Sequence, residues 1–193
     1  STLSPSSAAS DVYKRQLDIE PGLAFGSGSH PTTRLCLETL ERYAKNGDEV
    51  LDIGCGSGIL SIATLLLGAK HALGVDIDSL AVKTAKENAK QNGFAEDRFT
   101  AVQGNLSDKV SGKFDIVVAN IVADIIMEFN TEVGKFLKDD GVYITGGIIE
   151  NREDEVLYSF NQNGFKVIER HENNGWLLSL IHISEPTRLL SIS

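Results

Sequence analysis

The chain of 193 residues has little cysteine and no long apolar run. Two cysteines cannot form the disulfide framework of a small secreted domain, and they favour a reducing compartment. The longest apolar stretch, residues 59–67, is interrupted by Ser61 and Thr64, and it is far shorter than the roughly 18 residues that a membrane span needs. We therefore expect a cytoplasmic protein that makes no membrane contact.

Positive charge is also scarce. The chain has 18 Lys and Arg against 27 Asp and Glu, which gives a formal net charge of −9. A protein that coats DNA or RNA normally presents a basic face, so we expect no direct nucleic-acid partner. An acidic surface suits a basic protein partner instead, because opposite charges attract.

The two ends of the chain differ from its middle. Residues 1–16 are rich in serine and show neither strand alternation nor a helical apolar stripe, and residues 181–193 follow no pattern set by what precedes them. We predict that residues 1–16 are a non-native N-terminal extension and that residues 181–193 are a non-native C-terminal tail. A single functional domain is then expected over residues 17–180, which is an ordinary size for one domain.

The middle of the chain alternates apolar strand-like runs with helical stretches. The predicted strands are residues 49–53, 71–76, 99–103, 114–119, 142–145, 165–171 and 176–180. The predicted helices are residues 31–41, 59–67, 80–92, 125–137 and 150–163, with Ser79 as the cap of the third. Glu172-Asn-Asn-Gly175 predicts a hairpin between the last two strands. These elements predict an α/β fold: a Rossmann-like, doubly wound, mostly parallel seven-stranded sheet with an antiparallel C-terminal hairpin strand.

A glycine-rich loop follows the first predicted strand. In Val50-Leu-Asp52-Ile-Gly54-Cys-Gly56-Ser-Gly58, alternate glycines let the backbone lie against a ligand with no Cβ in the way. Dinucleotide enzymes use G-x-G-x-x-G, whereas here Ile59 stands where the third glycine would be. Asp52 would repel a phosphate but suits an ammonium group. A ligand with an amino-acid ammonium and carboxylate therefore fits the loop better than NAD, and a turn that merely needs glycines is the alternative.

Polar residues follow three other predicted strands. Asp76 lies 22 residues after Gly54, where an acidic residue accepts hydrogen bonds from ribose hydroxyls in nucleoside-binding α/β folds. The alternative is a solvated loop residue, a role that suits Asp78 better. Gly104-Asn105 could reach an adenine edge or form an ordinary turn. Asn120 points into the crevice beyond the strand ends, unless it caps the next helix.

Three segments resemble class I S-adenosylmethionine-dependent methyltransferases, and more closely the ribosomal protein L-eleven methyltransferase family. They are Pro21-Gly-Leu-Ala-Phe-Gly-Ser-Gly-Ser-His-Pro-Thr-Thr33, Asp52-Ile-Gly-Cys-Gly-Ser-Gly-Ile-Leu60 and Asn120-Ile-Val-Ala123. The resemblance runs from about Pro21 to Leu180. It implies S-adenosyl-L-methionine as the cofactor, bound by residues of these segments and of the second strand end: Thr33, Gly54, Asp76 and Asn120. Gly56 belongs to the same predicted cofactor loop.

The resemblance also implies an activity. Family members transfer methyl groups to α- and ε-amines of large-subunit ribosomal protein eleven, a basic protein. Asn120 and Thr33 are then the expected catalytic residues: Asn120 orients the amine, and Thr33 closes over it with residues 25–29. The family's small N-terminal recognition domain has no counterpart in residues 1–20, so we expect a catalytic domain only.

Other functions stay open. A nucleotide-dependent dehydrogenase would share the fold and Asp76, and a methyltransferase of a small molecule or a glutamine side chain would share the cofactor site. An isolated domain that binds the cofactor without turnover is the third alternative.

We expect His30 to be structural rather than a base, Trp176 to close the core rather than to stack on a ligand, and both cysteines to be small buried groups. No His, Cys and Asp spacing indicates a metal site.

Overall fold

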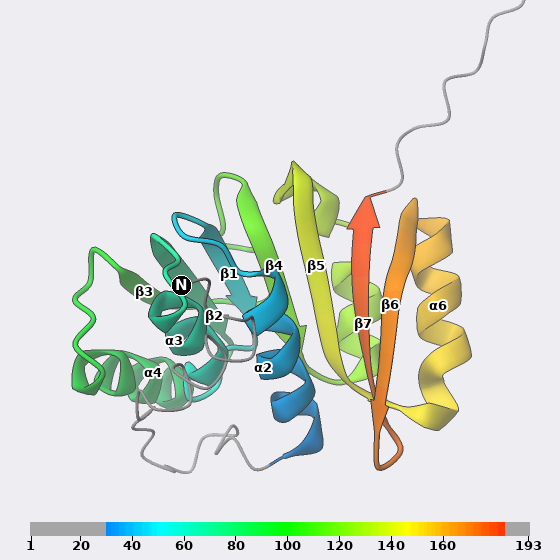
Figure 1. Cartoon of the computed structure of the whole chain (residues 1–193), viewed down its shortest axis with the longest axis horizontal. Coiled ribbons are helices and arrows are strands. Elements are labelled where there is room, and N and C mark those ends of the chain that lie inside the picture. Colours follow the sequence, from blue (N-terminus) through cyan, green and yellow to red (C-terminus); the bar gives the residue numbers. More distant parts are fainter. Residues whose placement is uncertain (1–29, 184–193) are drawn as a thin grey trace, which may run out of the picture.

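Seven strands form one sheet in the computed structural model, which describes residues 30–183 (Figure 1). The strands are β1 (Glu49–Ile53), β2 (His71–Asp76), β3 (Phe99–Gln103), β4 (Phe114–Asn120), β5 (Leu137–Ile149), β6 (Phe165–Asn173) and β7 (Trp176–Ile183). The helices are α2 (Pro31–Tyr43), α3 (Ile59–Leu66), α4 (Ser79–Gln91), α5 (Ala123–Phe129) and α6 (Glu153–Gln162), with short 3-10 helices η1 (Val133–Lys135) and η2 (Glu150–Arg152). The predicted N-terminal extension and residues 184–193 of the predicted tail lie outside the described residues.

The strand order is β3-β2-β1-β4-β5-β7-β6. Strands β3, β2, β1, β4 and β5 pair in parallel, and β7 runs antiparallel to both β5 and β6. The predicted fold class is therefore confirmed. The chain leaves β1 toward β3 and then returns to β4 on the other side of β1, and ligands of open α/β sheets bind at such a reversal.

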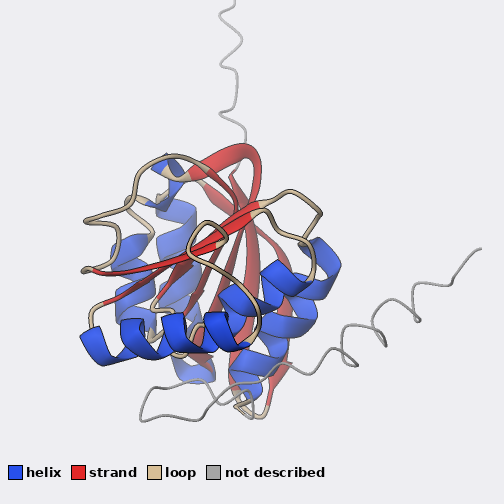
Figure 2. Cartoon of the chain, turned by 90° about the vertical axis from the view of Figure 1, so that its left-hand side faces the viewer, coloured by secondary structure: helices blue, strands red, loops and turns tan. Residues whose placement is uncertain are grey.

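Helices cover both faces of the sheet (Figure 2). One buried cluster contains residues of α2, α3 and α4, and a second contains residues of α5 and α6. Successive side chains of a strand point to opposite faces, so Val50 packs in the first cluster and Leu51 in the second. Ile116 and Val117 of β4 divide in the same way. This explains why the predicted inner strands are apolar without alternation.

The C-terminal hairpin turns at Asn174 and Gly175, which have φ angles of 53° and 77°. Two residues with positive φ match the type I′ turn, whose twist suits a two-residue hairpin. The predicted hairpin is thus confirmed, although both strands are longer than predicted. In particular, β7 continues through residues 181–183, and His182 pairs in register with Val142.

The structure corrects the predicted helix over residues 125–137. Helix α5 ends at Phe129, η1 follows, and Leu137 already pairs with Phe114 as the first residue of β5. Asp140-Gly141, predicted as a break before the fifth strand, lies inside β5 where the pairing register shifts. A Cβ on Gly141 would lie 2.9 Å from the Lys138 carbonyl oxygen, so this glycine permits a close backbone approach within the strand.

The cap of α4 is also corrected. Asp78, not Ser79, precedes the helix, and its Oδ1 accepts a hydrogen bond from the Leu80 N–H at 2.8 Å. Ser79 is the first helical residue. An aspartate is as good an N-cap as a serine, so the local sequence allowed either position. None of the helices within residues 30–183 is long and apolar enough to cross a membrane.

Replacement of Gly175 by alanine is expected to lower the free energy of unfolding by about 1–2 kcal/mol, because an alanine at positive φ is strained. A Cβ there meets no atom within 4 Å, so the cost is conformational alone. Gly134→Ala is the matched control, since Gly134 also has room and its φ is not positive. Urea unfolding followed by circular dichroism measures both. Equal effects of the two substitutions would contradict the strain argument.

Candidate functional site

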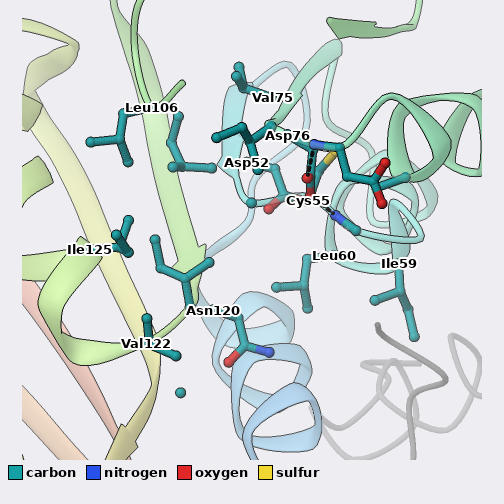
Figure 3. Close-up of a pocket in the computed structure, with 18 of the residues that line it drawn as sticks. Asp52, Cys55, Ile59, Leu60, Val75, Asp76, Leu106, Asn120, Val122 and Ile125 are labelled. Carbon is teal, nitrogen blue, oxygen red and sulfur yellow. Dashed lines mark hydrogen bonds between the residues drawn. The ribbon is translucent and has the colours of Figure 1, made fainter. Parts of the chain in front are cut away.

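A pocket of about 530 Å³ opens at the carboxyl ends of the parallel strands, beside the reversal between β1 and β4 (Figure 3). This volume is ordinary for a small-molecule site. Every predicted site residue lines the pocket: Thr33, Gly54, Gly56, Asp76 and Asn120. Gly104 and Asn105, predicted to reach an adenine or to form a turn, lie on its wall as well. The loop predicted over residues 25–29 lies outside the described residues.

The glycine loop joins β1 to α3 and needs its glycines for two reasons. Gly54, Gly56 and Gly58 all have positive φ, and Gly58 is the residue that precedes α3. A Cβ on Gly54 would overlap the Ile121 side chain, so the loop can lie against the segment after β4 only without one. The Gly54 N–H donates to the Val75 carbonyl at 2.8 Å, which ties the loop to β2.

Asp76 is held at the end of β2 by two backbone hydrogen bonds. Its Oδ2 accepts from the Gly56 N–H at 2.9 Å, and its Oδ1 accepts from the Asp78 N–H at 3.0 Å. The carboxylate is therefore fixed beside the glycine loop with lone pairs left for a ligand, because each ionised oxygen accepts more than one hydrogen bond. This arrangement differs from the alternative of a freely solvated loop residue.

Asp52 is a buried carboxyl on the pocket wall, with 1% of its surface exposed. Its Oδ2 accepts hydrogen bonds from the Ser61 N–H at 3.2 Å and from the Ser61 hydroxyl at 2.7 Å. Burial raises the pKa of this carboxyl to about 6, although the Ser61 hydrogen bonds act in the opposite direction. Asp52, in β1, is thus held in its ionised form by Ser61 of the first turn of α3, at a cost in solvation.

Asn120 and Thr33 meet although 87 positions separate them in the chain. Asn120 ends β4, Thr33 lies in the first turn of α2, and the Asn120 Nδ2 donates to the Thr33 hydroxyl at 3.4 Å. The Asn120 Oδ1 is buried and has no hydrogen-bond partner among the described residues. Since an unpaired buried acceptor costs about 1–3 kcal/mol, this oxygen is suited to accept an N–H from a ligand.

The charge of the pocket selects among ligand classes. Its lining within residues 30–183 contains three carboxylates, Asp52, Asp76 and Asp78, and neither lysine nor arginine. Figure 3 shows Asp52, Asp76 and Asn120 around a common space, with Val122 and Ile125 on its apolar side. A pyrophosphate would lie among like charges here, whereas a cationic ligand is stabilised. This favours the predicted ammonium-bearing ligand over a dinucleotide.

The family described as "Ribosomal protein L11 methyltransferase (PrmA)" matches residues 2–182. The chain belongs to this family. It is 53% identical over 158 residues to the ribosomal protein L11 methyltransferase of Dictyoglomus thermophilum, covering 82% of this chain and 52% of the relative. The counterpart in Clostridium botulinum is 48% identical over 160 residues, which cover 83% of this chain and 50% of the relative. The chain thus spans about half the length of the curated relatives it matches.

Solved structures agree with this assignment. The crystal structure of ribosomal protein L11 methylase from Lactobacillus delbrueckii subsp. bulgaricus superposes with a TM-score of 0.82 at 34% identity, covering 88% of this chain and 86% of that chain. A putative RNA methyltransferase from Pyrococcus horikoshii, 20% identical with a TM-score of 0.70 over 97% of this chain and all of that one, shares the fold. The predicted resemblance to the L11 methyltransferase family is confirmed by the family match, by the relatives and by the L11 methylase structure.

Trp176 lines the pocket, although the sequence predicted a different position for it. It was expected to close the core, but it is half-buried on the pocket wall, and its ring centroid lies 4.8 Å from that of His30. One signal could have located it. Because β7 is antiparallel, its first residue lies at the edge where the parallel strands end. His30 itself caps α2, with Nδ1 accepting from the Thr32 N–H at 3.3 Å, which is the structural role expected.

The remaining expectations concern the cysteines and the apolar wall. Cys36 and Cys55 are buried, and burial raises the pKa of both thiols, so they behave as the small buried groups that were expected.

The sequence analysis predicted no role for the apolar residues that follow the strand ends. Ile77 and Val122 are 70% and 62% exposed and line the pocket. An exposed apolar residue directly after a buried strand is the signal that could have found them.

Replacement of Asp52 by asparagine is expected to change the pH dependence of stability. The pKa of Asp52 is higher in the folded than in the unfolded chain, so the folded state binds more protons between about pH 4 and pH 6. Wild-type stability therefore falls relative to Asp52→Asn as the pH rises through this window. The variant should gain about 3 kcal/mol over wild type at pH 7 and almost nothing at pH 4.

Paired urea unfolding of the two proteins from pH 4 to pH 7 measures this difference. Groups far from Asp52 titrate alike in both proteins and cancel, so the difference reports on Asp52 together with its coupling to Asp76. A difference that stays constant over the whole range would show that Asp52 does not titrate as a buried carboxyl.

Proposed function

We propose that this chain is the S-adenosylmethionine-binding, methyl-transferring domain of a protein N-methyltransferase whose substrate is ribosomal protein L11. The observation that carries the proposal is the charge of the pocket: its described lining has three carboxylates and neither lysine nor arginine. Asn120, which also lines the pocket, has a buried amide oxygen with no hydrogen-bond partner among the described residues. A sulfonium and an ammonium both suit such a pocket. The names of the relatives support L11 as the substrate.

The residues of the pocket fit the cofactor along its length. Asp76 would hold the ribose hydroxyls, since its carboxylate is already oriented by the Gly56 N–H. Gly54 would let the cofactor approach the loop backbone closely, and it lacks a side chain because a Cβ there would overlap Ile121. Gly104-Asn105 would contact the adenine, and Asp52 would face the ammonium of the methionine part. Thr33 and Asn120 lie together at the acceptor end of this arrangement.

When bound, S-adenosylmethionine supplies a methyl group on a positively charged sulfur, so no metal or covalent enzyme intermediate is needed. The pocket must instead hold the acceptor amine neutral and in line. A lysine amine with a pKa near 10.4 is neutral in about one molecule in 2,500 at pH 7, a cost of about 4.6 kcal/mol. The apolar wall at Val122 and Ile125 lowers this cost, because desolvation disfavours the charged amine.

Asn120 would then orient the amine. Its Oδ1 accepts an N–H of the acceptor, which turns the nitrogen lone pair away from the amide oxygen, and the Thr33 hydroxyl fixes the amide through its Nδ2. His30 is the histidine in the described lining of the pocket, and it caps α2. We therefore assign no histidine as the base. Proton loss to water before transfer is the simplest route.

Two other functions would use the same fold. A dehydrogenase would have to bind the pyrophosphate of its dinucleotide in this pocket. The described lining has three carboxylates and neither arginine nor lysine, so its charge opposes a bound pyrophosphate. A methyltransferase of a small molecule or a glutamine side chain would share the cofactor contacts. Competition between L11 and such acceptors distinguishes it from the proposed enzyme.

Calorimetric titration with S-adenosylmethionine and with NADH tests the cofactor assignment. We expect saturable binding of one S-adenosylmethionine per chain and none of NADH, and we expect Asp76→Ala to weaken binding by at least about tenfold, the value of a lost charge-assisted hydrogen bond. Asp139→Ala is the matched control, because Asp139 is exposed near the amino end of β5, away from the strand ends that line the pocket. Binding of NADH by the folded chain would overturn the proposal.

Replacement of Asn120 by alanine separates chemistry from cofactor binding. We expect methyl transfer to purified L11 to fall by about 100-fold or more, the usual loss when an orienting group is removed, with a much smaller change in S-adenosylmethionine affinity. Labelled methyl incorporation and calorimetry give the two numbers. Cofactor binding by the wild-type chain without any transfer to L11 would instead favour a binding domain without turnover.

A further inference from the structure

We propose that Asn88 of α4 is a positioning residue for the cofactor pocket, because its side chain holds the glycine loop in the conformation that the cofactor meets. The inference rests on the proposed function and extends it to a residue that does not line the pocket. Asn88 acts through the backbone of Ser57, and it touches neither the cofactor nor the acceptor amine.

Asn88 is an unusual residue for its place in the fold. It lies inside α4 with 1% of its surface exposed, whereas asparagine is mostly a surface residue and a weak helix former. Its Nδ2 donates a hydrogen bond to the Ser57 carbonyl at 2.9 Å, and Ser57 is itself buried. A buried carbonyl needs a donor, since an unpaired one lowers stability. The amide of Asn88 thus reaches out of its own helix to bond the loop.

This hydrogen bond fixes one peptide group of the loop from one side, while the loop fixes the same group from the other. The peptide that joins Ser57 to Gly58 presents its carbonyl to Asn88, and its N–H donates to the Cys55 carbonyl at 2.8 Å. Gly58 directly precedes α3 and has a φ of 79°. Because both polar groups of the peptide are bonded, it cannot rotate without losing a hydrogen bond. The start of α3 is therefore held in direction as well.

Helix α4 presents one buried face to the loop and the pocket. Ala81, Ala85 and Asn88 follow one another at spacings of four and three residues, so they lie on the same side of the helix. Ala81 lines the pocket, and a Cβ on Gly58 would lie 3.0 Å from the Ala85 Cβ. The close approach of α4 to the loop at Ala85 brings Asn88 within hydrogen-bond distance of Ser57.

The segment that Asn88 holds adjoins two carboxylates of the pocket. Before Ser57, the Gly56 N–H donates to Asp76, which would hold the ribose. After it, the Ser61 N–H and hydroxyl donate to Asp52. A loop that moved would disturb both carboxylates. Holding the loop in place before the cofactor arrives raises affinity, because no binding energy is then needed to order the site.

Asn88→Leu tests the inference, because leucine keeps the branched shape of the side chain and removes the donor. We expect S-adenosylmethionine to bind about tenfold more weakly by calorimetry, which corresponds to an ordered loop in about one molecule in ten of the free variant. Hydrogen exchange of the amides of residues 54–61, followed by mass spectrometry, should be faster in the variant and should slow again at saturating S-adenosylmethionine. Equal affinity in the variant and wild type would overturn the proposal.

Asn130→Leu is the matched control. Asn130 is also a buried asparagine, and its Nδ2 donates to the Ser159 hydroxyl at 2.9 Å, but it lies with α5 and α6 on the other face of the sheet and does not line the pocket. Each substitution deletes a buried amide hydrogen bond, and we expect each to lower the melting temperature by about 2–10 °C. Only Asn88→Leu should weaken cofactor binding. An equal loss of affinity in both variants would show that Asn88 supports the fold alone, and would overturn the proposal.

Methyl transfer to L11 provides a measurement that a purely structural role would not change. With Asn88→Leu, we expect the KM for S-adenosylmethionine to rise by about tenfold, while kcat at saturating cofactor stays within about threefold of wild type, because the bound cofactor orders the loop again. A lowered kcat with an unchanged KM would contradict the proposal. Should Asn88→Leu not fold, Asn88→Ala replaces it in every comparison, since alanine is smaller and is the best helix former.

Failure of the proposed function gives a different result. If wild type binds no S-adenosylmethionine, the methyltransferase proposal fails. If wild type and Asn88→Leu bind S-adenosylmethionine equally well, only the positioning role of Asn88 is refuted.

Discussion

The pocket depends on one steric constraint: the segment after β4 lies so close to two glycines that neither position can carry a side chain. A Cβ on Gly54 would overlap the Ile121 side chain, and a Cβ on Gly147 would overlap the Ile121 backbone. Both glycines have positive φ, at 71° and 80°. Ile121 is thereby held between the β1–α3 loop and the end of β5, and Asn120, its neighbour, is placed on the pocket wall. Loop, strand end and site residue thus form one packed unit.

The same region contains a buried carboxyl, Asp52, whose ionised form lowers the stability of the fold. Asp52 is buried, its pKa is raised to about 6, and the Asp76 carboxylate adds repulsion to the cost of desolvation. A polar uncharged residue that accepts from Ser61 would stabilise the fold better. Retention of the carboxylate is understandable if the bound ligand brings a positive charge, because ligand binding then offsets the cost. With such a ligand, stability would be exchanged for affinity at this position.

Helix α2 brings Thr33 to the pocket, and contacts at its far end fix its direction. Arg42 forms an ion pair with Glu169 of β6 at 2.8 Å, and the Tyr43 hydroxyl donates to the same carboxylate. Hydrogen bonds from Tyr43 and His171, followed by Arg42, lower the pKa of Glu169 to about 2. The C-terminal strands therefore support the site twice, since β6 anchors α2 and β7 supplies Trp176.

Local sequence patterns determined much of this protein. Strands β1, β2 and β3, the central place of β4, the Asn-Gly hairpin and the spacing of Gly54, Gly56 and Asp76 could all be predicted, because strand burial, turn chemistry and glycine loops act over a few residues. Only the tertiary structure decided what depends on distant contacts. It ended α5 at Phe129 and gave Leu137 to β5, it paired Thr33 with Asn120 across 87 positions, and it carried Trp176 to the pocket on a reversed strand. Such contacts form only when separate elements pack together, and no local pattern encodes which elements will meet.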